Sequence, residues 1–547
     1  MRIVPVLLLS VTTAFAQQPA QISVRNAASL VDSSHAGIAV DSLIQVDLNP
    51  LPGLLPHLDP GTVSLTVEPL VTGVPVTLPI LSVSPSFYGV EAYLPANLPL
   101  GKARAVLSFN GQQSAPASVN LVASSFGLFP SLAQNILPDG TIQHNQLTYP
   151  AHPGQYVTLW GTGLGPARAN AVRVLVGGKP FPVEYAGPAP GLKGVDQINF
   201  QVPDDPTVPQ GCYVALQIDV GAGPYFDFLS NATTLSTSAN GGACQHPLGF
   251  TADQLAQIDA GRSVPAATIN VYALAGPPGG AHPVPGVYTR MESAYAEEFG
   301  FSSSSLPLFT EPLLADDAYF ACSATNNSFA GSILSVVGPV TDLGNPLILS
   351  SGSKTLKLLP QNPNFPIVYQ AIIPSPSPTP TPDALPPPFF TAGQWQVSAS
   401  GSDAVKPFQG SVLFPPQIRA TNFASLTTID RQKDQTIAWD PAGYGDSDIA
   451  MITLSGTQSV TQGSTTTTLN ESVTCRARAT DGHVTIPSSL LAGFAPSTSG
   501  NPLAFAQLSV APRSRQAAIF PISLTNGSTI PALIRYTFSE DWFITFQ

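Results

Sequence analysis

Short runs in which apolar and polar residues alternate recur along the chain, separated by turns that are rich in proline and glycine. The run Tyr156–Trp160 is an example, because it follows PAHPG and ends abruptly at GTGLGP. Alternation with β-branched and aromatic residues is typical of a half-buried strand, since successive side chains point to opposite faces of a sheet. The same pattern over most of the chain predicts an all-β protein.

A helical pattern interrupts the strands only briefly, at residues 251–260 (TADQLAQIDA). Thr251 is a good N-terminal cap for such a helix, and Gly261 is expected to end it. We therefore expect one short helix near residues 251–260 in an otherwise all-β chain.

The first half of the chain repeats itself. The matched segments are 99–111 with 209–221, 40–48 with 153–161 and, more loosely, 75–83 with 180–188. Two tandem domains follow, at residues 20–125 and 130–246. Their length and strand spacing predict immunoglobulin-like β-sandwiches.

The second copy resembles a family of immunoglobulin-like domains, related to the IPT/TIG type, that occurs in exported bacterial proteins. The resemblance rests on HPGQYVTLWGTGLGP (152–166), VRVLVGGKPFPVEYAGPAPGLKGVDQINFQVP (172–203) and VPQGCYVALQIDVG (208–221). The first copy matches weakly, because it lacks the GTGLGP glycines. The resemblance implies a sandwich used as a spacer or a binding module, and it carries over no catalytic residue.

Two further β-sandwich-like units are expected after the helix, at residues 250–415 and 416–547. The proline-rich segment 372–388 (IIPSPSPTPTPDALPPP) reads either as a stiff interdomain linker or as a long loop within one domain. Strand-like YQAII before it and QWQVSAS after it could pair, which favours a loop at 374–388 inside the third unit. The strands expected in these two units are 266–274, 332–337, 347–350, 367–373, 394–399, 436–439, 449–455, 472–477, 503–510, 517–522 and 532–538.

The first sixteen residues have the features of a secretory signal peptide: a charge at Arg2, an apolar run, and Ala14-Phe15-Ala16 as a cleavage site. We therefore expect a secreted, cell-surface or periplasmic protein. No later stretch is apolar for the roughly 18 residues of a membrane-spanning helix. A net charge of −12 with only 10% charged residues argues against nucleic acid as a partner.

Four cysteines in an exported chain point to disulfides rather than to thiol chemistry. Cys212 and Cys244 flank one strand-rich segment and are expected to form a local bridge. Cys322 and Cys475 then pair by elimination, and the alternative for them is two free buried thiols.

The glycines Gly161, Gly163 and Gly165 invite a phosphate-binding interpretation. The dinucleotide fingerprint, however, requires a sixth-position glycine where Pro166 stands, and it must open a helix. The residues that follow lead instead into the β-like run VRVLVGG. We expect a structural turn and no cofactor.

Catalytic and metal-binding patterns are not found in the sequence. The seven histidines never take an HxxxH or HExxH spacing, and no GxSxG occurs. Adjacent strand residues point to opposite faces, so a single acidic doublet cannot supply a glycosidase pair; these doublets are Asp204-Asp205, Glu297-Glu298 and Asp316-Asp317. The turn Asp446-Ser447-Asp448, with Asp440, could hold calcium, although a solvated turn is favoured. We expect no catalytic, cofactor-binding or metal-binding residue.

The four tryptophans are the candidates for a sugar-stacking platform, although most of their positions favour core packing; they are Trp160, Trp395, Trp439 and Trp542. The sequence as a whole favours a secreted, non-enzymatic binding or adhesion protein, with a carbohydrate or a cell-surface protein as partner. Two alternatives stay open: a polysaccharide-active hydrolase with its site in residues 260–547, and a structural spacer. The oligomeric state is left open.

Overall fold

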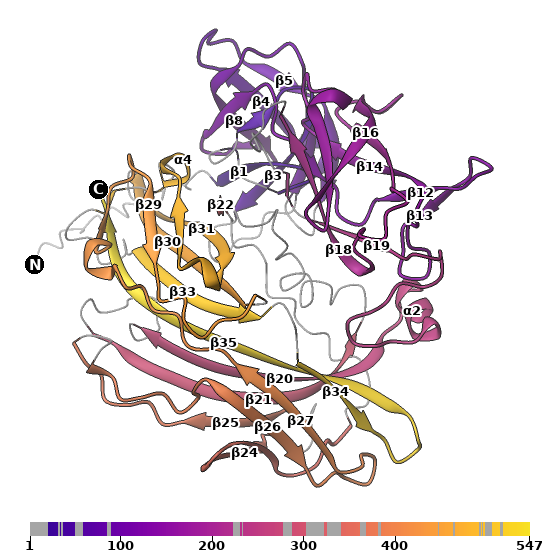
Figure 1. Cartoon of the computed structure of the whole chain (residues 1–547). Helices are drawn as coiled ribbons and strands as arrows, with labels where there is room; N and C mark the ends of the chain where they lie inside the picture. Colours follow the sequence, from indigo (N-terminus) through magenta and orange to yellow (C-terminus); the bar gives the residue numbers. More distant parts are fainter. Residues whose placement is uncertain are drawn as a thin grey trace, which may run out of the picture.

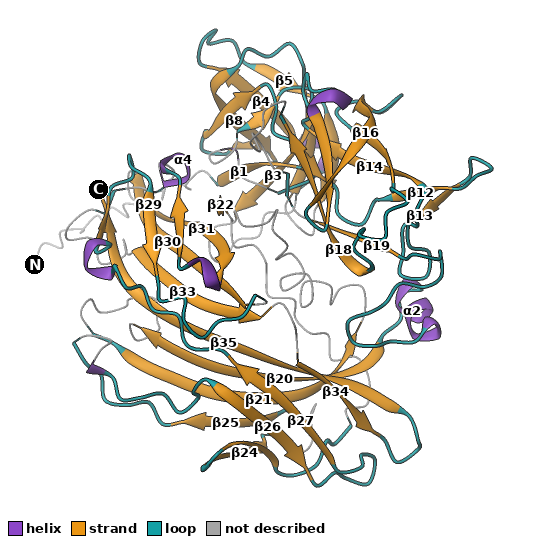
Figure 2. Cartoon of the chain, viewed as in Figure 1, coloured by secondary structure: helices purple, strands orange, loops and turns teal. Residues whose placement is uncertain are grey.

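The structure is a computed structural model that describes residues 20–30, 33, 37–49, 58–84, 89–221, 230–231, 233–276, 287–301, 322–324, 341–361, 368–380, 384–446, 448–462, 465–491, 494, 496–497, 506–514 and 518–547. Strands dominate these residues, and the helices are few and short (Figure 2). The predicted all-β fold class is confirmed. The proposed signal peptide lies outside the described residues.

The first unit is a sandwich of two sheets. One has the strand order β1-β3-β7-β6, and the other β2-β10-β8-β4-β5, with β9 paired to β8. Their inward side chains form one apolar core. The strands are β1 (Gln21–Asn26), β2 (Ile38–Ala39), β3 (Ser42–Asn49), β4 (Ser64–Pro69), β5 (Val76–Leu78), β6 (Ile80–Ser84), β7 (Gly89–Leu94), β8 (Gly101–Phe109), β9 (Gln112–Gln113) and β10 (Ala117–Val122).

The second unit repeats this arrangement, with the order β12-β14-β17-β16 continuing into β15-β18-β19. Strand β16 belongs to both layers, because its first half pairs with β15 and its second half with β17, across an irregularity between Val183 and Tyr185. The matched sequence segments occupy equivalent strands: β3 and β14, β8 and β18, and β5–β6 and β16. The strands are β11 (Gly127–Leu128), β12 (Gln134–Ile136), β13 (Ile142–His144), β14 (Tyr156–Thr162), β15 (Val172–Val176), β16 (Lys179–Pro188), β17 (Asp196–Gln201), β18 (Gly211–Val220) and β19 (Thr233–Thr237).

The rest of the chain is organised around a long curved sheet, below the two sandwiches in Figure 1. Its main strand order is β22-β31-β30-β33-β35-β20-β21-β25-β24-β23-β26-β27. Strands β28 and β34 also pair with β35, and β29 and β32 form a separate two-stranded sheet. The strands in this part of the chain are β20 (Val264–Gly276), β21 (Thr289–Phe301), β22 (Cys322–Ala324), β23 (Leu347–Ser351), β24 (Lys354–Pro360), β25 (Tyr369–Ile373), β26 (Gly393–Ala399), β27 (Phe408–Phe414), β28 (Thr428–Ile429), β29 (Gln435–Ala438), β30 (Asp448–Gln462), β31 (Thr465–Arg478), β32 (His483–Ile486), β33 (Ala506–Ser514), β34 (Ala518–Ser523) and β35 (Thr529–Phe546).

Strand β35 joins the two C-terminal units that the sequence suggests. It pairs in parallel with β20 and antiparallel with β33. Its first half packs in a core with β20–β27, while Trp542, Ile544 and Phe546 pack in a second core that starts at Ile418. Strands from both predicted units, 250–415 and 416–547, therefore share one sheet, and the boundary between these units stays a prediction.

The proline-rich segment is a loop between strands of one sheet. It is tied to that sheet, because Tyr288 and Thr379 exchange two backbone hydrogen bonds of 2.8 Å. The carboxylate of Glu292 also accepts hydrogen bonds from the amides of Phe389 and Phe390, at 3.0 and 2.9 Å. One detail of the expectation is wrong: β25 and β26 do not pair with each other, because β24 and β23 lie between them.

The expected helix is present as α2 (Ala252–Asp259). Thr251 and Gln254 form a reciprocal capping box, and Gly261 follows the helix at φ +74°. A single turn, α4 (Ser488–Leu491), was not foreseen.

A further apolar core contains side chains of the second sandwich, α2 and the long sheet. At its centre, Nδ1 of the buried His246 accepts a hydrogen bond from the Leu248 amide at 3.0 Å, so the ring proton is on Nε2, 2.9 Å from the Tyr213 hydroxyl. Burial lowers the pKa of His246 to about 3, and the imidazole is neutral. The apolar side chains around His246 thus pack the second sandwich against the long sheet.

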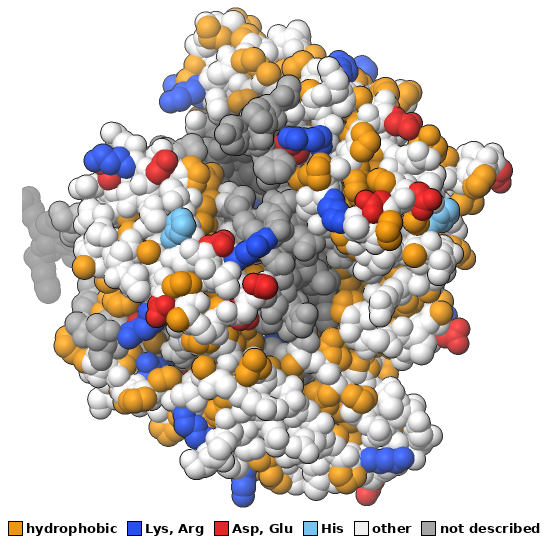
Figure 3. Space-filling model, in the orientation of Figure 1, with side chains coloured by type: hydrophobic (Ala, Val, Ile, Leu, Met, Phe, Trp, Pro, Cys, Tyr) orange, Lys and Arg blue, Asp and Glu red, His pale blue; other side chains and the backbone are white. Residues whose placement is uncertain are grey.

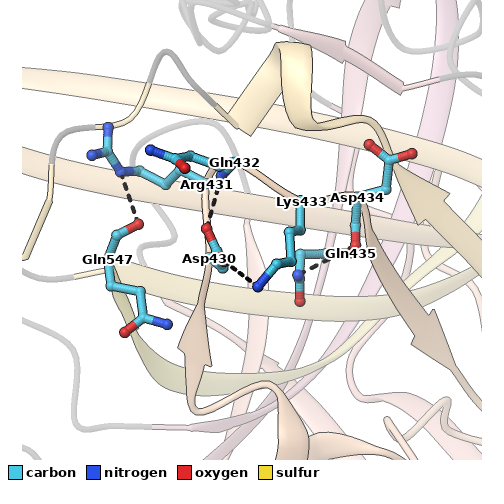
Figure 4. A network of polar contacts seen from close by, with 7 residues as sticks. All are labelled: Asp430, Arg431, Gln432, Lys433, Asp434, Gln435 and Gln547. Atoms are coloured by element: carbon cyan, nitrogen blue, oxygen red, sulfur yellow. Dashed lines mark hydrogen bonds and ion pairs between the residues drawn. The ribbon is translucent and has the colours of Figure 1, made fainter.

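The last residues are held by a polar network (Figure 4). The backbone carbonyl of Gln547 accepts from the Arg431 amide and guanidinium, at 3.2 and 3.3 Å. Asp430 pairs with Lys433 at 2.8 Å. These contacts hold the end of β35 beside β28.

Candidate functional site

The three motif glycines lie where the first sandwich meets the second. Gly163 and Gly165 have φ of +89° and +67° in the turn after β14, a conformation that glycine adopts without strain. The chain segment 123–127, which connects the sandwiches, runs directly over this turn. A Cβ at Gly163 would lie 2.6 Å from the Ser125 carbonyl oxygen, and one at Gly165 would overlap the carbonyl of Ala123.

Side chains from both sandwiches hold this joint. Asn26 donates to the carbonyls of Ser125 and Thr162, at 2.9 and 3.3 Å. The Thr162 hydroxyl accepts from the Leu43 amide at 2.7 Å and donates to the Gly194 carbonyl at 2.5 Å. The glycine motif is therefore part of an interdomain joint.

A buried carboxylate lies beside the joint. Oδ2 of Asp196 accepts from the Leu164 amide at 2.8 Å, and only 6% of this residue is exposed. Burial is the main reason why its pKa rises to about 6; the charge of Asp41 raises it further, while the Leu164 and Gly163 amides and Arg168 oppose the shift.

We expect Asp196→Asn to reduce the pH dependence of the melting temperature between about pH 4 and 6. Because folding raises this pKa from 3.8 to about 6, the folded chain binds the proton more tightly than the unfolded chain. The contribution of this carboxyl to the free energy of unfolding is therefore fully present below pH 3.8 and is lost as the pH rises through about 6. At 1.36 kcal/mol per pKa unit, the difference is about 3 kcal/mol.

Scanning calorimetry of the full chain across this pH range measures the effect. The exposed Asp204→Asn variant is the control and should keep the wild-type slope. An unchanged slope in Asp196→Asn would show that the buried carboxyl does not govern this dependence.

Both disulfides are present. Cys212 and Cys244 are bonded with their Cα atoms 4.9 Å apart. Cys322 and Cys475, the pair reached by elimination, are bonded directly across β22 and β31. Disulfides are typical of extracellular and periplasmic proteins.

The tryptophan candidates separate clearly. Trp395, Trp439 and Trp542 are 0, 3 and 7% exposed, and each belongs to a core. Trp160 alone among the four is half-buried, on the outer side of β14. The structure therefore leaves one of the four as a candidate for ligand contact.

Trp160 belongs to a surface, here called the outer face, on strands β12, β14, β16 and β17 of the second sandwich; β12, β14 and β16 are labelled at the right of Figure 1. Its residues, of which all but the buried Thr158 are at least partly exposed, are Gln134, Tyr156, Thr158, Trp160, Glu184, Tyr185, Gln197, Asn199 and Gln201, from β12, β14, β16 and β17. The residues that alternate with them, such as Leu159 and Phe200, fill the core. The alternation therefore directs this set away from the core.

The strand register arranges these side chains in rows, because directly opposite residues share a face. Trp160 lies opposite Gln197, which lies opposite Gly187. A second row is formed by Gln134, Thr158, Asn199 and Tyr185. In a third, Tyr156 lies opposite Gln201.

The aromatic side chains of the outer face are partly exposed. Tyr156 is 40% and Tyr185 38% exposed. The Tyr185 hydroxyl donates to the Pro188 carbonyl at 2.7 Å, so its ring lies back over Gly187, where a Cβ would come 3.2 Å from that hydroxyl. The tyrosine ring thus lies in the row of Trp160, with Gln197 between the two rings.

Hydrogen bonds between neighbours orient the amides of the outer face. Trp160 Nε1 donates to Gln134 Oε1 at 3.1 Å, and Gln197 Nε2 donates to Asn199 Oδ1 at 2.9 Å. Thr158 Oγ1 also donates to Asn199 Oδ1, at 3.0 Å. These bonds use one end of each amide, and within the described residues no hydrogen bond engages Gln134 Nε2, Asn199 Nδ2 or Gln197 Oε1.

Glu184 supplies a negative charge at the edge of the outer face. Its carboxylate, through its charge and a hydrogen bond, raises the pKa of Tyr156. The rows described above contain no lysine or arginine. His144, opposite Gln134 on β13, is the ionisable neighbour at the far edge.

The equivalent face of the first sandwich is different. Its strand β3 carries Gln45 and Asp47, and Asp47 pairs with Arg25 at 3.2 Å. Glu91 on β7 accepts from Ser82, and the Tyr93 hydroxyl donates to Asp41 at 2.6 Å. At the position equivalent to Trp160 the first sandwich thus has Asp47, in an ion pair, while Gln45 and Tyr93 keep an amide and an aromatic ring on this face.

Four carboxylates of the C-terminal units, at Glu298, Asp440, Asp448 and Glu540, are engaged in hydrogen bonds within the protein, whereas burial raises the pKa of Glu297. Glu540 accepts two 2.7 Å bonds from Arg419, and Glu298 accepts from the Thr341 amide. In the acidic turn, Asp448 accepts from the Gly445 amide at 2.8 Å and Asp440 from the Ala442 amide at 3.0 Å. Asp316-Asp317 lies outside the described residues.

Neither a metal-binding group of side chains nor a membrane-spanning helix is found in the described residues. Within the described part of the chain, no three His, Cys, Asp or Glu residues are grouped so that they could hold a metal ion. Lys and Arg side chains lie scattered among uncharged atoms on the face drawn in Figure 3. None of the helices that the structure describes is long and apolar enough to span a membrane.

Solved structures similar to this chain include binding and adhesion proteins. One is the Bacteroides ovatus mixed-linkage glucan utilization locus protein SGBP-B in complex with a mixed-linkage heptasaccharide, at 12% identity and TM-score 0.20. The match covers 38% of this chain and 46% of that one, so this chain spans less than half the length of that protein. Another is the Escherichia coli adhesin FdeC, at 12% identity and TM-score 0.14, covering 71% of this chain and 95% of that one. A third is a tetra-tandem repeat from the extending region of a large adhesion protein, at 11% identity and TM-score 0.13, covering 96% and 99%.

No family model matches the chain, and no curated protein matches it.

Sequence reasoning found Trp160 but not its companions on the outer face. A signal for them exists: DQINFQ (196–201) alternates amides with buried apolar residues, and YVTLW (156–160) does the same with aromatic residues. What the sequence lacks is the register that brings these strands side by side. The irregularity at Glu184, which turns Tyr185 onto the same face, was also not visible.

Proposed function

We propose that the protein is an exported, non-enzymatic binding protein that takes a carbohydrate on the outer face of its second sandwich. The observation that carries this proposal is the row Trp160–Gln197–Tyr185, in which two aromatic rings flank an amide. Aromatic rings stack on the apolar faces of sugar rings, and amides bond their hydroxyls. Both chemistries occur together on this face.

The first sandwich supports the proposal by contrast. It shares the strand order of the second but has the ion pair of Arg25 with Asp47 on its equivalent face. A sandwich of this strand order therefore folds without a tryptophan at the position of Trp160, which favours a binding role for that side chain. We also propose that the second sandwich belongs to the IPT/TIG-related family and that the leader at residues 1–16 directs export.

The hydrolase alternative receives less support. A glycosidase pair needs one carboxyl that can donate a proton and a second that faces the sugar. Glu292, Glu298 and Glu540 instead accept hydrogen bonds from backbone amides or an arginine, which fix loops and strands. Their structural roles favour a protein that binds rather than cleaves.

Trp160→Ala should weaken polysaccharide binding about tenfold or more, because truncation of a tryptophan that anchors a binding site typically costs about 2 kcal/mol or more. Affinity gel electrophoresis of the full chain on a panel of polysaccharides measures the retardation. The matched control is Tyr149→Ala: Tyr149 is a 50% exposed aromatic residue of the same sandwich that lies outside the outer face.

Equal losses in Trp160→Ala and Tyr149→Ala would contradict the proposed location of the site. Lack of retardation by every polysaccharide would contradict the proposed function. Release of reducing sugar by the wild-type chain would favour the hydrolase instead.

A further inference from the structure

The outer face carries features that select among carbohydrates, and the inference drawn from them rests on the proposed function. The features are the sign of its charge and the spacing of its rings. Each is fixed by strand register.

The charge on the outer face is negative. Glu184 is an exposed carboxylate on the β16 irregularity, and Tyr156 beside it contributes a hydroxyl. His144 stands at the opposite edge, beyond Gln134. Glu184 lies beside Tyr156, four residues along β14 from Trp160 and therefore roughly 13 Å from the Trp160 row. A ligand on that row meets no lysine or arginine, and the Glu184 charge repels a uronate or sulfate group through space.

The distance between the rings of Trp160 and Tyr185 suits a chain of several sugars rather than a single sugar. Trp160 and Gly187 are two strand steps apart, which is about 9.5 Å because neighbouring strands lie 4.7–4.9 Å apart. The Tyr185 ring covers Gly187, so the two rings are farther apart than one pyranose ring can cover. A chain that crosses the strands can stack one sugar on each ring and present hydroxyls to Gln197 between them.

We propose that the outer face binds a neutral, extended polysaccharide that lies across strands β14, β17 and β16, and that Glu184 excludes acidic polysaccharides. The amides at Gln134, Gln197 and Asn199 suit hydroxyl groups, since each offers a donor or an acceptor without a full charge. Specificity here is a difference between two affinities, and the carboxylate supplies the repulsive part.

The test uses two polysaccharides that differ in one group: a β-linked mannan and polymannuronate, which carries a carboxylate on each sugar. Isothermal titration calorimetry of the full chain at low salt should give binding to polymannuronate that is severalfold weaker than to mannan, because several uronates of one chain feel the charge. Added salt should reduce this ratio, because exposed charges are screened.

Glu184→Gln keeps the size and polarity of the side chain and removes its charge. The ratio of polymannuronate affinity to mannan affinity should rise severalfold. The control is Glu91→Gln, which removes a carboxylate from β7 of the first sandwich. It should leave the affinities for mannan and polymannuronate unchanged.

The outcomes distinguish exclusion of acidic polysaccharides by Glu184 from carbohydrate binding itself. If polymannuronate binds the wild-type chain as tightly as mannan does, or if Glu184→Gln leaves their ratio unchanged, this inference is wrong and the carbohydrate site stands. If neutral and acidic polysaccharides all fail to bind, the proposed function itself fails.

Discussion

Gly165→Ala should destabilise the joint between the two sandwiches by about 2–5 kcal/mol. An alanine at φ +67° pays roughly 1–2 kcal/mol for the left-handed conformation. Its methyl group would also overlap the carbonyl of Ala123, and relieving that overlap costs about 1–3 kcal/mol more. The backbone itself must move, because no side chain is there to give way.

Gly191→Ala is the matched control for this prediction. Gly191 has φ +79° in the same sandwich, but a Cβ there would meet nothing within 4 Å. The control therefore pays the conformational cost alone, about 1–2 kcal/mol. The difference between the two variants isolates the contact between the turn and the connecting segment.

Hydrogen exchange followed by mass spectrometry locates the effect, and calorimetry gives its size. The Ser125 amide donates to the Gly163 carbonyl at 2.9 Å, so peptides covering 121–130 should exchange faster in Gly165→Ala than in Gly191→Ala. Equal stability and equal exchange in the two variants would mean that the connecting segment does not pack on the turn.

Reduction of the Cys212–Cys244 bond should lower the free energy of unfolding by about 4 kcal/mol. The bond closes a loop with a sequence separation of 32, and loop entropy in the unfolded chain gives this magnitude. Both cysteines pack in the core that joins the second sandwich, α2 and the long sheet. Loss of the bond should therefore loosen this joint as well.

The experiment is cleanest in a Cys322→Ala, Cys475→Ala background. There, reductant breaks only the Cys212–Cys244 bond and leaves both sulfur atoms in place, so packing is unchanged. Denaturant unfolding with and without reductant gives the difference. An effect below about 1 kcal/mol would mean that the core alone holds this segment.

Much of the architecture follows from the sequence by itself. Period-two alternation predicts strands because one face of each strand must be buried, and most strands expected beyond residue 260 appear as β20, β23, β25, β26, β29, β30, β31, β33, β34 and β35. The strand expected at 332–337 lies outside the described residues. Strand β21 was missed, since TRMESAYAEEFGF mixes charges with small residues and presents no strong apolar face.

The sequence also determines features that depend on neighbouring residues alone. The cap of Thr251 on α2 depends on residues three positions apart, and the turn after Trp160 depends on glycines within a few residues. The internal repeat is visible because both copies bury the same strands. The Cys212–Cys244 pair was accessible for the same reason, since both cysteines flank one segment.

Only the tertiary structure decided what these local features are for. The register of β12, β14, β17 and β16 gathers Trp160, Tyr185 and Gln197 onto one face, and register is a relation between strands that no single segment contains. The glycine turn became an interdomain joint because segment 123–127 folds over it. Long-range pairing likewise carried β35 beside β20, which joins residues 267–275 to residues 532–540 in one sheet.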